Sequence, residues 1–140
     1  MSQVHDNIIT AYQIDFENEQ LTIKTDYYYD GKLSEKTDIV FSGYLTHMFN
    51  NEIKNSILFD VEEQPLSFFL EKEHELLEDN RCYGWPINYK TTDAHTELTE
   101  FMQKNEYKVF EISSSYGLYG WVLAKQMKIV VSDEYYKRPK

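Results

Sequence analysis

The sequence has few of the features that would place it outside the cytoplasm or in a membrane. It has one cysteine, Cys82, which cannot form an internal disulfide, and it begins without the basic, apolar and small-residue segments of a secretory leader. Its apolar runs are only a few residues long, whereas a membrane-spanning helix needs roughly 20 apolar residues in succession. These absences predict a soluble protein that works in the reducing cytoplasm.

Glycine and proline are also scarce, with 5 and 3 copies in 140 residues. No repeat, low-complexity tract or linker rich in Gly, Ser or Pro divides the chain, and its length is typical of one domain. We therefore expect a single domain over residues 1–140, large enough to bury a hydrophobic core without disulfides. The polar residues 132–140 are expected to fray at its end.

Basic residues are in the minority, with 14 Lys and Arg against 24 Asp and Glu and a net charge of −10 at pH 7. Such a charge repels nucleic acid and anionic lipid, so we expect neither as a partner, and a basic protein fits better. The imbalance is concentrated between Asp60 and Asn80, where eight acidic residues accompany Lys72 as the only Lys or Arg.

Aromatic residues are plentiful, at 16% of the chain, and they favour β-structure because their rings pack well on a pleated surface. Six segments have the alternation or composition of strands, and residues 17–20 have the length of a hairpin link. The expected strands cover about residues 12–16, 21–29, 36–49, 56–62, 107–115 and 120–131, with bends near Gly43 in the third strand and near residues 125–128 in the last.

Two segments carry apolar residues at helical spacing. The first begins at Pro65 and runs to about Glu78, with acidic residues on its other face. The second has Thr92 or Asp93 as its N-cap and ends at Asn105. The sequence therefore predicts an α+β fold: a twisted, mainly antiparallel sheet of about six strands, either open or curled toward a barrel, with two helices packed on it.

The stretch SSSYGLYGW, residues 113–121, combines hydroxyls, glycines and aromatic rings. A nucleophile elbow needs a glycine two residues before and two residues after its serine, and none of the three serines has both. Phosphate and dinucleotide loops lead into a helix, whereas Gly120 leads into a strand pattern. The stretch therefore predicts a β-hairpin with Tyr116, Tyr119 and Trp121 at its tip, where their rings could contact a ligand or partner.

The remaining candidates for chemistry are weak. The four histidines lack metal-ligand spacing, so we expect no metal, no cofactor and no catalytic residue. His47 follows the bend at Gly43. We interpret it as a histidine that is hydrogen-bonded within or beside the core, and not as a catalytic residue. Cys82 has no neighbouring base and is interpreted as a small, buried hydrophobic residue. Asp60 and Glu62 share a strand face and could act as acid and base, but such pairs arise by chance in a chain this acidic.

The acidic segment permits two interpretations. It is the solvated face of an amphipathic helix, which keeps the protein soluble, or it is an electrostatic docking surface for a basic protein. The second interpretation adds the aromatic residues that follow the helix, since interfaces often place an aromatic anchor beside a charged rim. Its candidate partner-binding residues are Glu71, Glu75, Glu78, Tyr83 and Trp85.

Four segments of the chain resemble an uncharacterised family of small acidic bacterial proteins. They are TDIVFSGYLTHMF (residues 37–49), NSILFDVEE (55–63), YGWP (83–86) and ISSSYGLYGWVLA (112–124), and the likeness extends over most of the chain. The family has no established activity, so the resemblance implies no catalytic residues. The size and acidity are also similar to those of bacterial immunity proteins, which bind and neutralise a toxin domain, although no motif is shared.

These observations favour a non-enzymatic cytoplasmic binding protein, of which an immunity-type inhibitor of a basic partner is one example. The alternative is a small-molecule-binding protein or enzyme, with a pocket between sheet and helices lined by His47, Tyr83, Trp85, Tyr116 and Trp121. A homo-oligomer formed by pairing of edge strands is a third possibility, which the sequence does not indicate.

Overall fold

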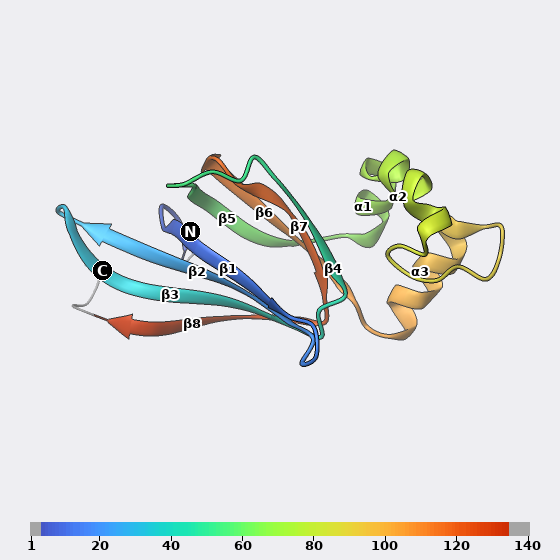
Figure 1. Cartoon of the computed structure of the whole chain (residues 1–140), viewed down its shortest axis with the longest axis horizontal. Helices are drawn as coiled ribbons and strands as arrows, with labels where there is room; N and C mark the ends of the chain where they lie inside the picture. The colour runs from blue at the N-terminus through green and yellow to red at the C-terminus, as the bar shows by residue number, and fades with distance from the viewer. Residues whose placement is uncertain (1–3, 135–140) are drawn as a thin grey trace.

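The computed structural model describes residues 4–134 and has an α+β fold, as the sequence predicted. It differs from the expectation in the number of elements, with eight strands and three α-helices in place of six and two (Figure 1). The strands are β1 (Ile8–Asp15), β2 (Gln20–Tyr29), β3 (Lys32–Ser42), β4 (Thr46–Asn50), β5 (Ile57–Gln64), β6 (Lys108–Tyr116), β7 (Tyr119–Ala124) and β8 (Gln126–Glu134). The helices are α1 (Leu66–Lys72), α2 (His74–Asn80) and α3 (Ala94–Lys104), and a 3-10 turn covers Arg81–Tyr83.

The eight strands form one antiparallel sheet in the order β4-β7-β6-β5-β1-β2-β3-β8. Its first and last strands, β4 and β8, do not pair with each other, so the sheet of the described residues is open. The two extra strands arise at the two expected bends. Gly43, with a φ of +65° that favours glycine, separates β3 from β4, and Lys125 separates β7 from β8. The Lys125 N–H donates to the carbonyl of Ser42 across the bend at 3.0 Å.

Because both long strands bend at the same place, the sheet folds over itself and its two halves enclose a core. One half is β1-β2-β3-β8 and the other is β5-β6-β7-β4, and Figure 1 shows them converging at the bend and diverging away from it. Their facing side chains bury one hydrophobic cluster, in which Phe41 and Phe110 have ring centroids 5.6 Å apart. Its fully buried members include Leu21, Ile23, Ile39, Phe41, Leu58, Ile112 and Val122.

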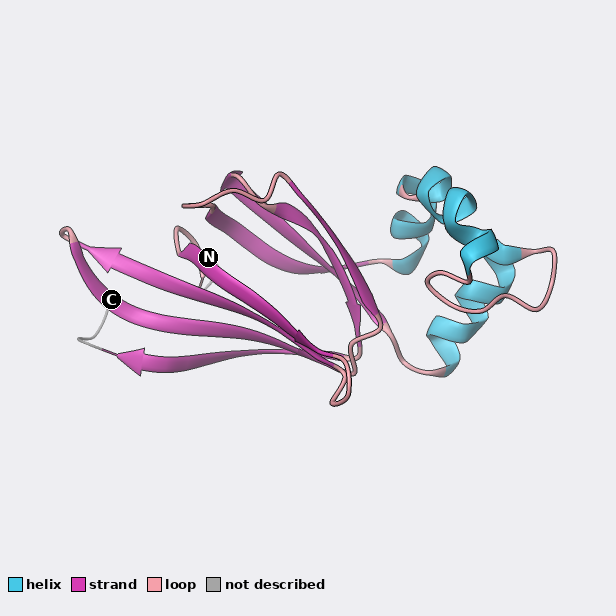
Figure 2. Cartoon of the chain, in the orientation of Figure 1, coloured by secondary structure: helices cyan, strands magenta, loops and turns pink. Residues whose placement is uncertain are grey.

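The helices cover the opposite face of the half that contains β6 and β7, and they gather at one end of the molecule (Figure 2). The first predicted helix is interrupted at Glu73, whose φ of −101° ends α1 and starts α2. The predicted limits of α3 are confirmed: the Asp93 side chain accepts a hydrogen bond from the Thr96 N–H, and Asn105 is the C-cap. A second hydrophobic cluster lies between helices and sheet, with Phe69, Leu70, Leu77, Leu98, Met102, Val109, Trp121 and Leu123 as its buried members.

The stretch SSSYGLYGW forms the predicted hairpin between β6 and β7. Gly120 is indispensable there, because a Cβ added to it would lie 1.9 Å from the carbonyl oxygen of Met48 on β4, and its φ is +154°. The close approach of β4 to β7 therefore requires a residue without a side chain at this position.

The predicted frayed tail, residues 132–140, starts too early, because β8 continues to Glu134. The rest of that tail lies outside the described residues. None of the helices formed by residues 4–134 has the length and apolar content that a membrane-spanning helix needs.

Candidate functional site

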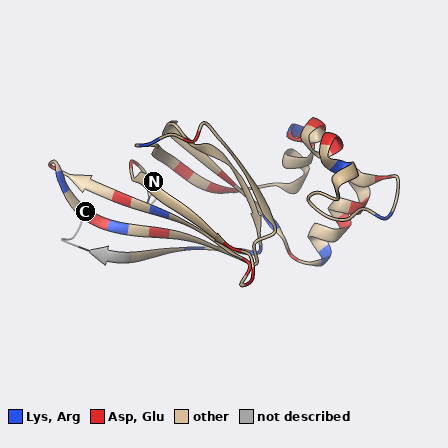
Figure 3. Cartoon of the chain, viewed as in Figure 1, with Lys and Arg blue, Asp and Glu red and all other residues tan. Residues whose placement is uncertain are grey.

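The acidic residues of α1 and α2 point into solvent. Glu71 on α1 and Glu75, Glu78 and Asp79 on α2 are all exposed, and Figure 3 shows acidic residues on both helices. The pattern that buries Phe69, Leu70 and Leu77 leaves these carboxylates on the other side, as an amphipathic helix requires. We call Glu71, Glu75, Glu78 and Asp79 the acidic helix surface.

The basic residues nearest to this surface are already engaged in ion pairs. Lys72 Nζ lies 3.6 Å from Glu111 Oε2 on β6, and an Arg81 guanidinium nitrogen lies 3.9 Å from Glu78 Oε2. Within residues 4–134, Glu71, Glu75 and Asp79 have no Lys, Arg or His at ion-pair distance. The acidic helix surface therefore keeps a net negative charge, and Glu78 is its only member with a cationic partner among the described residues.

The two aromatic residues that follow α2 have different environments. Tyr83 is 80% exposed and lies at the end of the 3-10 turn, close in sequence to the acidic helix surface. Trp85 is half-buried: its indole N–H donates to Thr46 Oγ1 on β4 at 3.0 Å, and its ring centroid lies 5.9 Å from that of Trp121. Trp85 therefore attaches the loop to the sheet, and only Tyr83 presents its ring to solvent.

A second group of acidic residues lies on strands β5 and β6. Asp60 and Glu62 lie two residues apart on β5, and Glu111 on β6 pairs in register with Glu62. Hydrogen bonding to Asp60, together with the repulsion between their charges, raises the pKa of Glu62. Lys72 contacts Glu111 from α1, so it connects this group to the acidic helix surface. The shared face expected for Asp60 and Glu62 is present, but it is a solvated face of the sheet.

The residues predicted to line a pocket are spread over separate parts of the fold. In the β4–β7 pairing, His47 is opposite Val122 and Met48 is opposite Trp121, so His47 and Trp121 point to opposite faces of the sheet. The expectation that Trp121 presents its ring at the hairpin tip is wrong: it is 5% exposed and packs under the helices, with its ring centroid 4.9 Å from that of Phe69. Tyr116 and Tyr119 are 49% and 46% exposed and stand beside the hairpin tip, as expected. These side chains do not converge on one cavity.

His47 belongs to a cluster that the sequence did not indicate, between β1 and β4. Its Nδ1 lies 2.8 Å from the Tyr44 hydroxyl, and its ring is 4.6 Å from Phe49. Burial lowers the pKa of His47, which favours the neutral imidazole. The Tyr12 hydroxyl donates to the Glu52 carboxylate, and this bond contributes most to raising the pKa of Tyr12 to about 12. Tyr12 and Phe49 of this cluster pack against the sheet core, which agrees with a hydrogen-bonded His47 beside the core.

Two of the grooves that border the helices combine apolar and charged residues. The first has a volume of about 540 Å³ and lies between α1, the start of α2 and α3, with Leu66, Leu70, Glu71, His74, His95 and Thr99 among its lining residues. The second has a volume of about 810 Å³ and lies between α3 and the loop before it. Lys90, Lys104, Glu97 and Glu100 all line the second groove, so its lysines and glutamates balance. Sequence patterns did not predict either groove, because each combines residues from separate segments.

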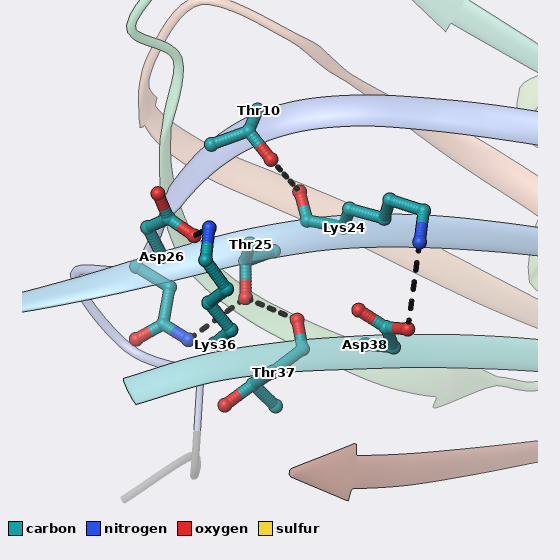
Figure 4. Close-up of polar contacts among 8 residues, drawn as sticks. Thr10, Lys24, Thr25, Asp26, Lys36, Thr37 and Asp38 are labelled. Atoms are coloured by element: carbon teal, nitrogen blue, oxygen red, sulfur yellow. Dashed lines mark hydrogen bonds and ion pairs between the residues drawn. The ribbon is translucent and has the colours of Figure 1, made fainter. Parts of the chain in front are cut away.

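The charged residues of β2 and β3 are arranged differently from those of the helices. In register, Lys24 faces Asp38 and Asp26 faces Lys36, and the ion-pair distances are 3.9 Å and 3.2 Å (Figure 4). Beside them, the Thr25 hydroxyl donates to the carbonyl of Thr37 at 2.7 Å. This part of the sheet is therefore locally neutral.

Within residues 4–134, the structure places no group of three or more His, Cys, Asp and Glu side chains where they could hold a metal ion. Cys82 is exposed, in contrast to the buried position expected for it, and no residue of the 3-10 turn that contains it is buried.

Comparison with known proteins identifies no relative: no family model, no curated protein and no solved structure matches the chain. The inference of function therefore depends on the chain's own residues.

Proposed function

We propose that this chain is a non-enzymatic binding protein of the cytoplasm that engages a basic protein through the acidic helix surface, in the manner of an immunity-type inhibitor. The observation that carries the proposal is the set of exposed carboxylates of Glu71, Glu75 and Asp79, which have no ion-pair partner among the described residues. Tyr83, the most exposed large side chain of this region, stands next to them in the sequence.

The physical effect of such a surface is mainly on association. Like charges held together on one side of a protein produce a potential that attracts a cationic partner over roughly 10 Å at moderate ionic strength. Exposed charges of this kind raise the association rate and discriminate against acidic competitors, whereas affinity depends more on buried aromatic and aliphatic anchors. Tyr83, which is 80% exposed, is the candidate anchor.

The alternative of a small-molecule site lined by His47, Tyr83, Trp85, Tyr116 and Trp121 has less support. His47 and Trp121 point to opposite faces of the sheet, and Tyr83 is 80% exposed in the 3-10 turn that follows α2. A ligand that touched all of them would have to pass through the sheet. The binding-protein proposal needs no such convergence.

The test is affinity capture from the cells that encode the chain, with a matched pair of variants. The immobilised chain is expected to retain a basic protein at about 50 mM salt and less of it at about 300 mM. The variant E71K/E75K should lose this protein. The control Q13K/E17K/Q20K raises the net charge by the same amount at exposed positions of the β1–β2 hairpin and should retain it. Retention of nothing at either salt, or equal capture by E71K/E75K, would show that the proposal is wrong.

A further inference from the structure

The groove between α1 and α3 has an apolar floor and a polar rim. Leu66 and Leu70 of α1 form its floor, and His95 and Thr99 of α3 form the opposite wall. Leu70 is buried by the second hydrophobic cluster, so the floor is continuous with the packed interface between helices and sheet. A side chain entering the groove would therefore meet hydrocarbon that is held in place from below.

Apart from histidines, the titratable side chains that line this groove and its continuation are acidic or tyrosine. Glu71, which has no ion-pair partner among the described residues, lines it, and Glu78, which is paired with Arg81, lines its narrow continuation toward Tyr89. No Lys or Arg of the described residues lines either part. The larger groove on the other side of α3 offers a direct contrast, because Lys90 and Lys104 accompany its glutamates. The smaller groove is thus the one whose charge complements a basic occupant.

We propose that the α1–α3 groove receives a short amphipathic helix of the basic partner, with aliphatic side chains on Leu66 and Leu70 and Lys or Arg side chains beside Glu71. This inference rests on the proposed function and specifies how the partner is held. Recognition of a helix in a groove uses aliphatic anchors at positions i and i+4, on one face of the helix. The seven residues of α1 extend over about 10 Å, enough to contact about two turns of such a helix.

The probe for this proposal is a labelled synthetic peptide of about 14 residues in which Leu at helical spacing alternates with Lys. We call it the Leu–Lys peptide. Two further peptides separate the contributions of charge and of hydrocarbon: the Leu–Glu peptide carries Glu in place of every Lys, and the Lys–Ser peptide carries Ser in place of every Leu. Binding is measured by fluorescence anisotropy at about 150 mM salt. The Leu–Lys peptide is expected to bind at least about tenfold more tightly than either of the others, since the groove offers both hydrocarbon and negative charge.

Two variants fill the groove from opposite walls. Ser67→Trp acts from α1 at an exposed position, and Thr99→Trp acts from α3. Each should weaken binding of the Leu–Lys peptide about tenfold or more and leave the weaker binding of the Lys–Ser peptide unchanged. Gln13→Trp, at an exposed position on β1, adds the same side chain elsewhere and should change nothing. Thermal unfolding shows whether each variant is folded. If Thr99→Trp does not fold, Ser67→Trp still tests the proposal.

The outcomes distinguish this inference from the function on which it rests. If E71K/E75K loses the Leu–Lys peptide while Ser67→Trp and Thr99→Trp retain it, the acidic surface stands and insertion into the groove is wrong. Equal binding of the Leu–Lys and Lys–Ser peptides would also overturn the groove, and equal binding of the Leu–Glu peptide would overturn its charge selectivity. If neither E71K/E75K nor the Trp variants weaken binding, both proposals are wrong.

Discussion

The two charged regions of this protein, the β2–β3 pair and the α1–α2 layer, satisfy their charges in different ways. On the strands, Lys24 and Lys36 stand opposite Asp38 and Asp26, so each of these two aspartates meets a cation of the same sheet. On the helices, Lys72 and Arg81 are held by Glu111 and Glu78, and Glu71 and Glu75 are left to solvent. The difference teaches that β2 and β3 neutralise their charges within the sheet, whereas the acidic helix surface keeps carboxylates that no Lys or Arg of the described residues neutralises.

The largest effect on stability should come from a substitution in the sheet, because the chain cannot fold without the sheet. Gly120→Ala would place a methyl group 1.9 Å from the carbonyl oxygen of Met48 in a backbone conformation that suits glycine. We expect a loss of roughly 3 kcal/mol or more in the free energy of unfolding. Urea unfolding measures it, and a loss below about 1 kcal/mol would show that β4 can move away from β7 at little cost.

The paired charges of β2 and β3 should contribute a moderate amount. Lys36→Ala removes a cation 3.2 Å from the Asp26 carboxylate, and Asp26 is only 8% exposed. We expect the free energy of unfolding to fall by about 1 kcal/mol, and by under about 0.5 kcal/mol for the control Lys24→Ala, whose ion pair is longer and more exposed. If urea unfolding shows equal losses for the two variants, the claim that the more buried ion pair contributes more stability is wrong.

The smallest effect on stability is expected at Asp93, an acidic residue of the helix layer that accepts hydrogen bonds from Thr96. Hydrogen bonds from the Thr96 side chain and N–H lower the pKa of Asp93. Because its pKa is lower in the folded than in the unfolded state, the stability it contributes is present above the unfolded value near 4 and is lost as pH falls through the folded value. Asp93→Ala should therefore lower the melting temperature at pH 7 more than at pH 2.

Asp93→Asn is the control for this prediction, because it keeps the capping oxygen and removes the titration. Its melting temperature should be close to that of the unaltered chain and should depend less on pH between 2 and 7. A drop equal to that of Asp93→Ala at pH 7 would mean that charge, and not the hydrogen bond to Thr96, is what α3 needs at its start.

Local patterns were sufficient to predict most of the fold. The alternation of Leu21 and Ile23 with polar residues depends only on neighbouring positions, and so do the turn at Gly43 and the caps at Asp93 and Asn105. The interruptions depend on distant contacts. Lys125 divides its strand because the neighbouring chain bends beside it, and Glu73 divides its helix between Phe69 and Leu70 on one side and Leu77 on the other, all members of the second hydrophobic cluster.

The candidate site was less predictable for the same reason. The exposure of the acidic residues follows from helical spacing, but that of Tyr83, which lies beyond the predicted helix, does not. Trp85 and Trp121 lie near each other only because β4, β7 and the loop after α2 meet. An indole can face either solvent or core, and the sequence near it does not decide which. The α1–α3 groove likewise joins residues about thirty positions apart, such as Leu66 and His95.

The central claim, that the acidic helix surface attracts a basic protein, is tested most directly by the rate at which the captured partner associates with the chain. We predict that E71K/E75K lowers this rate about tenfold or more at 50 mM salt and removes most of its dependence on salt, while Q13K/E17K/Q20K, with the same change in net charge, leaves both largely intact. Equal rates and equal salt dependence for the unaltered chain and E71K/E75K would contradict the account.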